Sequence, residues 1–157
     1  MSKDDREVVA DWLMLAGAVA LFVSLFLPWS HQLPPGFEAI FGSSDLLQGV
    51  PRDPTAWQVY SAADVVLALL AALLLGVALL GSRPVRIAAT GATLLGLAFA
   101  LHALSDPPSN GAANIFSPGR SVPSYLPVTP GAGIGETVAI LALAGALVGL
   151  VLSFTAD

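Results

Sequence analysis

The sequence contains no cysteine among its 157 residues. Disulfide bonds, cysteine zinc sites, iron–sulfur clusters and thiolate nucleophiles are therefore excluded. Charge is also scarce, since 11% of the residues are charged, against roughly a quarter in soluble domains. The 6 basic residues are outnumbered by 11 acids and form no long run. We therefore expect no nucleic-acid partner.

Catalytic motifs are missing too. The sequence has no HExxH, GxSxG or GxxxxGKS/T pattern, and no metal or haem pattern includes His31 or His102. The string GAGIGE at 131–136 looks like a phosphate-binding loop, but no strand precedes it and a proline-rich segment does. It is more typical of a flexible lead-in to a helix. We predict that the protein is not an enzyme and has no catalytic residue, cofactor or metal site.

The sequence has four long apolar segments that contain no charged residue. The sequence is 55% hydrophobic and its mean hydropathy is +0.79. No charged residue occurs in 12–29, 65–82, 87–104 or 137–156, where His102 is the one titratable group. Each segment is close to the roughly 20 residues that span the hydrocarbon core as a helix. We predict an all-α membrane protein, a four-transmembrane-helix bundle in one domain (1–157), with helices at about 8–29, 62–82, 84–104 and 135–155.

The first apolar segment follows Lys3 and Arg6, as a signal sequence would. It is longer than the roughly 7 to 15 residues of a signal-peptide core, and no small-residue cleavage pattern precedes Trp29. We interpret it as a retained helix whose membrane exit is LPWS, with Trp29 at headgroup depth and Pro28 ending or bending the last turn.

The basic residues predict the orientation. Lys3 and Arg6 precede the first helix, and Arg83 and Arg86 lie in or just after the turn GSRPVR, whereas each long connection holds one arginine. The positive-inside rule then places both termini and this turn in the cytoplasm (N-in, C-in). Two long loops, at about 30–61 and 105–134, face outward. The short turn makes the second and third helices antiparallel neighbours, with Pro84 in a first helical turn.

The two outer loops differ in composition. Phe37, Ile40, Phe41 and Leu47 recur at near-helical spacing in the first loop, which suits either a short helix on the membrane surface or a cap over the helix ends. The second loop is rich in proline, glycine, serine and asparagine and should be irregular.

Small residues four positions apart occur on every predicted helix. Transmembrane helices associate by close backbone approach at such residues. The pairs are Ala16 and Ala20, Ala72 and Gly76, Ala92 and Gly96, and Gly145 and Gly149. They predict a compact bundle with helix–helix interfaces at Gly76, Gly96, Gly145 and Gly149, and a surplus stripe at Gly145 and Gly149 for another subunit.

Four ionisable residues should meet at the outer ends of the helices: Asp64, His102, Asp106 and Glu136. Such a cluster could bind an ion or pass a proton. Alternatively, Asp64, in the capping-box pattern SAAD (61–64), and Glu136 would cap their helices, while His102 and Asp106 pair at i and i+4. Asp11, near the cytoplasmic start of the first helix, would be solvated or paired with a basic residue.

Several short motifs occur in a fixed order: LPW, then TAWQVYSAADVVLALLA, LHALSDPPSN and PGAGIGETVAILALAGALVG. In this order the chain resembles a group of small four-pass membrane proteins of unassigned function that are common in high-GC Gram-positive bacteria. The resemblance implies a multi-pass protein of the bacterial plasma membrane and implies no activity. The first outer loop looks longer than is usual in that group.

Two classes of function fit these features. The first is a structural or accessory subunit of a larger membrane assembly, which binds other membrane subunits or copies of itself through small-residue stripes and aromatic outer loops. The second is a small oligomeric ion transporter or channel that uses the outer acidic and histidine cluster. Against the second, the helices hold few polar residues, chiefly Ser24, Thr90, Thr93 and Ser153.

Overall fold

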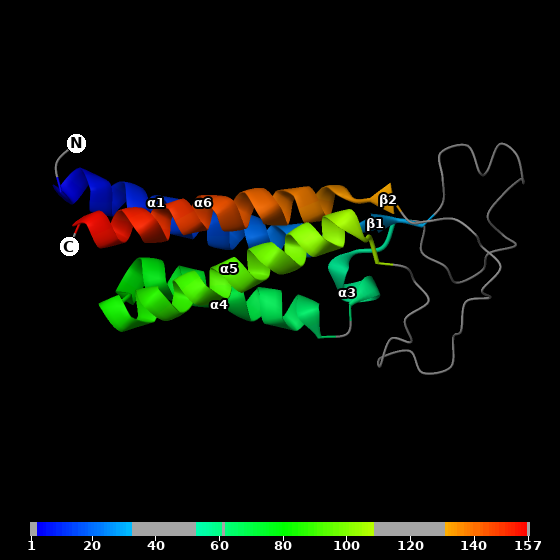
Figure 1. Ribbon diagram of the computed structural model, residues 1–157, viewed down its shortest axis with the longest axis horizontal. Helices are drawn as coiled ribbons and strands as arrows, with labels where there is room; N and C mark the ends of the chain where they lie inside the picture. Colours follow the sequence, from blue (N-terminus) through cyan, green and yellow to red (C-terminus); the bar gives the residue numbers. More distant parts are fainter. Residues whose placement is uncertain (1–2, 33–52, 61, 109–130, 157) are drawn as a thin grey trace, which may run out of the picture.

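The computed structural model describes residues 3–32, 53–60, 62–108 and 131–156. Its four long helices are α1 (Lys3–Ser24), α4 (Ala63–Leu80), α5 (Arg83–Ser105) and α6 (Ile134–Ala156) (Figure 1). All four are long and apolar enough to cross a membrane. The prediction of a multi-pass, all-α protein with four such helices is thereby confirmed. The expected surface helix or cap near 37–47 lies outside the described residues.

The four helices pack side by side as two antiparallel pairs (Figure 1). α1 and α6, the first and last helices, make the most extensive contact, while α4 packs on α1 and α5 packs on α6. α4 and α5 form the predicted hairpin, in which Pro84 lies in the first turn of α5. We call the end of the bundle near the chain termini the terminal end. The opposite end, which carries two short strands, is the strand end.

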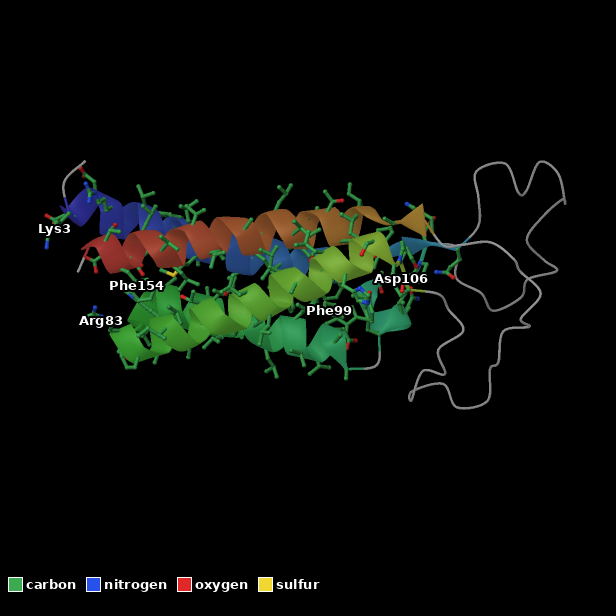
Figure 2. The ribbon with its side chains drawn as sticks, in the orientation of Figure 1. Lys3, Arg83, Phe99, Asp106 and Phe154 are labelled. Carbon is green, nitrogen blue, oxygen red and sulfur yellow. The ribbon has the colours of Figure 1, made fainter. Side chains whose placement is uncertain are left out.

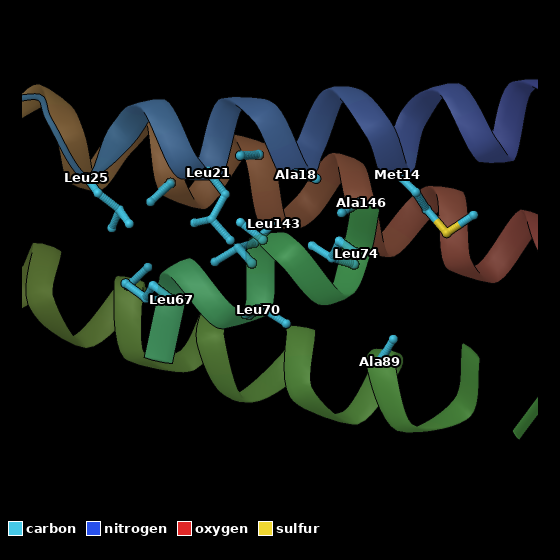
Figure 3. Close-up of a cluster of buried hydrophobic side chains, with 14 of the residues drawn as sticks. Met14, Ala18, Leu21, Leu25, Leu67, Leu70, Leu74, Ala89, Leu143 and Ala146 are labelled. Carbon is cyan, nitrogen blue, oxygen red and sulfur yellow. The ribbon is translucent and has the colours of Figure 1, made fainter. Parts of the chain in front are cut away.

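The core lies between all four helices (Figure 3). Leucine and methionine side chains of α1, α4 and α6 meet small residues of α5 and α6 there. The fully buried members include Met14, Leu21, Leu74, Ala89, Leu143 and Ala146. The outward faces carry exposed leucine, valine and phenylalanine side chains along their length, as expected for helices whose solvent is lipid.

At the strand end, the chain segments that leave and enter the helices are tied together. β1 (Ser30–His31) pairs antiparallel with β2 (Gly131–Ala132), which places Ser30 opposite Ala132. A short helix, α3 (Ala56–Val59), begins after Thr55, and a bridge joins Thr55 to Pro28. These elements connect the exit of α1 to the start of α6, across about two thirds of the chain. All of them lie in segments that the sequence pattern predicts to be loop or helix exit.

The exit of α1 differs from its prediction. The helix ends at Ser24 and not near residue 29, and Leu25, Phe26 and Leu27 follow in turns. The Trp29 side chain is 0% exposed, so it packs inside the protein, and its expected position at headgroup depth stays a prediction. Its Nε1–H donates a hydrogen bond of 2.8 Å to the carbonyl of Ser24. The same carbonyl also accepts a hydrogen bond of 3.1 Å from the backbone N–H of Leu27, so the Trp29 ring is fixed to the turn that ends α1.

Candidate functional site

The four predicted ionisable residues all lie near the strand end, but they do not form one cluster. His102 and Asp106 are exposed near the end of α5, whereas Asp64 and Glu136 are buried in the first turns of α4 and α6. Among the described residues, no group of three or more histidine, cysteine or acidic side chains is arranged to hold a metal ion. His102 and Asp106 share a helical backbone hydrogen bond, and no ion pair joins their side chains.

Asp64 has the surroundings of a helix-capping residue. It is 4% exposed, and its Oδ1 accepts a hydrogen bond of 2.8 Å from the backbone N–H of Val65. Such a bond occupies one of the unpaired N–H groups of the first turn. The N-cap position itself is Ala62, and Ser61, the first residue of the expected capping box, lies outside the described residues.

Glu136 is different, because its carboxylate lacks the hydrogen bonds of a cap. The side chain is 0% exposed, and neither Oε1 nor Oε2 has a hydrogen-bond partner. The backbone N–H of Gly133 interacts with the carboxylate electrostatically but does not reach hydrogen-bond geometry. Glu136 does lie in the first turn of α6, where the helix dipole favours an anion, so its predicted role as a cap stays a prediction. A buried carboxylate without a hydrogen-bond partner carries a large desolvation cost in its charged form.

Two glycines fix Glu136 in this place. The N–H groups of Gly133 and Gly135 donate to the carbonyls of Trp29 and Pro28, at 3.3 and 2.8 Å. A Cβ on Gly135 would lie 2.5 Å from the Trp29 ring, and one on Gly133 would overlap the Pro28 carbonyl. Only glycine permits this approach. The GAGIGE string, expected to be a flexible lead-in, instead packs the start of α6 against the exit of α1.

Three aromatic rings lie beside this junction: Trp29, Tyr60 and Phe99. The ring centroids of Tyr60 and Phe99 are 5.2 Å apart, and those of Trp29 and Tyr60 are 5.6 Å apart, both pairs edge to face. Burial raises the pKa of the Tyr60 phenol, and the negative charges of Glu136 and Asp106 raise it further. We call these three residues the aromatic triad.

Sequence reasoning missed both the triad and a side-chain contact between His31 and Asp53. Nδ1 of His31 in β1 lies 2.6 Å from Oδ1 of Asp53, and both side chains are about half exposed. Nothing in the sequence pattern links these residues, which are brought together by the bridge between Pro28 and Thr55. At the terminal end, Asp11 interacts electrostatically with Arg86, which is buried at the start of α5. The two alternatives predicted for Asp11, solvation or pairing with a basic residue, stay predictions.

The hydroxyl groups inside the helices do not form a polar path. Ser24, Thr93 and Ser153 are buried, and each donates to a carbonyl one turn earlier in its own helix, at 2.6 to 2.7 Å. Thr90 does the same at 2.8 Å. These hydroxyls are therefore satisfied within the helices and do not point to a water-filled channel.

The predicted glycine interfaces fall into two classes. Gly149 faces α1, where a Cβ would lie 2.7 Å from the Ala10 carbonyl oxygen, and Gly96 faces Leu70 and Leu143. At Gly76 and Gly145, no atom lies within 4 Å of the place that a Cβ would occupy. The expectation that Gly145 and Gly149 together face another subunit is therefore wrong, because Gly149 is buried inside the bundle. Gly17, which belongs to no predicted pair, meets Ala142 and Ala146 of α6 instead.

No family model, curated protein or solved structure matches this chain. The resemblance to small four-pass proteins of high-GC Gram-positive bacteria thus stays a prediction. Two features of the structure bear on function. One is the unpartnered Glu136 beside the aromatic triad, and the other is the set of glycines that face away from the bundle.

Proposed function

We propose that the protein is a structural or accessory subunit of a larger assembly in the bacterial plasma membrane. The observation that supports this is the position of two glycines on the α4–α5 hairpin. Gly76 and Gly91 lie inside α4 and α5, are exposed, and have no atom within 4 Å of the place of a Cβ. Neither glycine therefore serves the packing of the chain itself.

The presence of an exposed glycine inside a helix requires an explanation. It costs about 1 kcal/mol of helix stability relative to alanine, and in lipid its advantage is that it lets another helix approach closely. Ala72, one turn before Gly76, is also exposed, and so is Ala88 before Gly91. Each helix of the hairpin thus has a pair of exposed small residues among exposed leucines. A transmembrane helix of a partner, or of a second copy of this chain, would fit there.

Replacing Gly76 by leucine should separate the chain from its partner without disturbing its fold. The open space around Gly76 accommodates the side chain, whereas a partner helix would be held away. Native mass measurement of protein extracted from its own membrane should show a shift from the assembly toward the 16.0 kDa chain. Ala16→Leu, which adds similar bulk to an exposed position on α1, is the matched control and should leave the assembly intact. A wild-type chain that is monomeric in native lipid would reject the proposal.

We also propose the N-in, C-in orientation, which the basic residues at the terminal end support. Asp106 is exposed at the strand end and Ser82 at the turn of the hairpin. In this cysteine-free chain, Asp106→Cys should react with a membrane-impermeant thiol reagent in whole cells. Ser82→Cys should react only after the cells are permeabilised. The reverse pattern would show that the strand end faces the cytoplasm.

An oligomeric ion transporter or channel is the second candidate, and one observation favours it: the buried, unpartnered Glu136. The satisfied hydroxyls of the helices give it no support, since a water-filled path requires exposed polar groups along its length. The ionisable cluster predicted for this function also no longer includes Asp64, because the Asp64 carboxylate accepts a hydrogen bond from the backbone of its own helix. Glu136 therefore points to binding at one end of the bundle rather than to a continuous pore.

A further inference from the structure

A groove opens on the outward side of the bundle between α1 and α4, close to the terminal end. Its volume is about 300 Å³, at the lower end of the range for small-molecule sites. The residues that line it are Val8, Asp11, Trp12 and Leu15 of α1 and Ala78 and Leu79 of α4. Val8, Trp12 and Leu79 are exposed large hydrophobic residues, so the groove faces the lipid. Asp11 is the charged member of an otherwise apolar lining.

The carboxylate of Asp11 lies in the wall of this groove. The residue is half-buried, and its Oδ1 is buried without a hydrogen-bond partner. The side chain makes no ion pair within 4.0 Å to a basic residue of the described part of the chain. A carboxylate at a lipid-facing surface is costly unless hydrogen-bond donors or an opposite charge approach it. A ligand that brings both to the groove would therefore be held by Asp11.

The ends of the helices show the depth at which Asp11 lies. Ala78 and Leu79, which share the groove with Asp11, belong to the last turn of α4, and residues 81–82 then connect α4 to α5. Irregular backbone that faces lipid does not occur within the hydrocarbon region, so this connection lies at the level of the lipid headgroups. Asp11 is close to the same level. The exposed Trp12 beside it suits this depth, because tryptophan is enriched at the membrane interface.

A basic side chain lies at this depth too. Arg83 begins α5 directly after the connection and is exposed, and Figure 2 shows it at the terminal end of the bundle. An acid and an arginine at headgroup depth match a zwitterionic headgroup, because its ammonium and its phosphate carry opposite charges. A lysine or arginine of a partner helix would match Asp11 alone, and Arg83 would repel it. The charges therefore favour a lipid as the occupant of the groove.

We propose that this groove binds phosphatidylethanolamine. Its ammonium group lies at the Asp11 carboxylate, its phosphate is directed toward Arg83, and the upper part of an acyl chain follows the apolar lining. A primary ammonium has three N–H donors for a carboxylate, whereas the quaternary ammonium of phosphatidylcholine has none. Asp11 thus selects the primary amine by hydrogen bonding as well as by charge. The ligand reaches the groove sideways from the bilayer, and the proposal does not depend on the accessory-subunit function.

The test is native mass spectrometry of the whole delipidated chain, titrated in detergent with phosphatidylethanolamine, phosphatidylcholine or phosphatidylglycerol of equal chain length. We expect the wild type to bind phosphatidylethanolamine at least about fivefold more tightly than either other lipid, on the scale of one charge-assisted hydrogen bond. Asp11→Asn keeps the size of the side chain and should remove most of this preference. Asp4→Asn removes an exposed acid from the first turn of the same helix and should change the affinity by no more than about twofold.

A second variant tests the groove apart from its charge. Ala78→Leu fills the groove while it keeps the carboxylate, and it should weaken binding of phosphatidylethanolamine. Equal affinity of the wild type for phosphatidylethanolamine and phosphatidylcholine, or equal affinity of the wild type and Asp11→Asn for the first lipid, would each overturn the proposal. So would loss of a co-purifying membrane protein from Asp11→Asn with lipid binding unchanged, since Asp11 would then pair with a basic residue of that partner. If Asp11→Asn does not fold, Ala78→Leu and the comparison of lipids decide.

Discussion

Gly149→Leu should open the packing of α1 against α6 and lower the free energy of unfolding by at least about 3 kcal/mol, the upper end of typical overpacking costs. A Cβ alone at this position would lie 2.7 Å from the Ala10 carbonyl oxygen and 3.0 Å from the Leu13 Cβ. Because the first of these neighbours is backbone, a side-chain rotation cannot relieve the contact. Denaturant titration in mixed micelles, followed by circular dichroism, measures the change.

Gly145→Leu is the matched control, since it makes the same replacement one turn earlier on the same helix. No atom lies within 4 Å of the place of its Cβ, so the free energy of unfolding should not fall and should rise by up to about 1 kcal/mol, because leucine is a better helix former than glycine. An equal loss of unfolding free energy in both variants would mean that any leucine substitution destabilises α6. It would also mean that Gly149 does not form a close contact with α1. Gly17→Leu, on the facing helix, should resemble Gly149→Leu.

Trp29→Ala should be the most damaging truncation at the strand end, at a cost of about 3 to 5 kcal/mol, as for large aromatic residues in cores. The ring is fully buried, packs against Tyr60 and Phe99, and donates its N–H to the end of α1. Its loss would leave a cavity where the exit of α1 meets the start of α6. Thermal unfolding in nanodiscs provides the measurement.

Trp12→Ala provides the comparison, because this tryptophan is 66% exposed on the outward face of α1. This substitution should lower the free energy of unfolding by well under half as much as Trp29→Ala does. Trp29→Phe should fall between the two, since it keeps most of the ring packing and loses the hydrogen bond to Ser24. If Trp29→Ala is no more harmful than Trp12→Ala, the buried position of Trp29 is wrong and a headgroup anchor is the better interpretation.

Helix number and approximate extent can be predicted from the sequence because they depend on local composition. A charge-free segment of sufficient length has one stable form in lipid, whatever its neighbours are. The hairpin around Pro84 is equally local, since a turn of that length permits only antiparallel neighbours. The placement of Asp64 in the first turn of α4 follows from the sequence for the same reason.

Features that depend on contacts between distant residues could not be predicted. Spacing identifies small residues, but it does not say which face of a helix is turned inward, so it places Gly149 on the outside and gives no reason to single out Gly17. The pairing of Ser30 with Ala132 and the approach of Gly135 to Trp29 join segments about 100 residues apart. The capping role predicted for Glu136 rests on its position in the helix, which is local information. Its missing hydrogen bonds are a property of the packed bundle.

The contact between α1 and α6 also has a consequence for how the protein is made. The two helices are separated by 109 residues, from the end of α1 at Ser24 to the start of α6 at Ile134, which a ribosome needs about 5 to 20 s to translate. During that interval the nascent chain holds α1 in the bilayer with its glycine and methionine face unoccupied. Assembly of the bundle is therefore post-insertional and waits for the last helix. A ribosome stalled before residue 134 would leave open the face of α1 that packs against α6, even though α4 has already been made and packs on another face of α1.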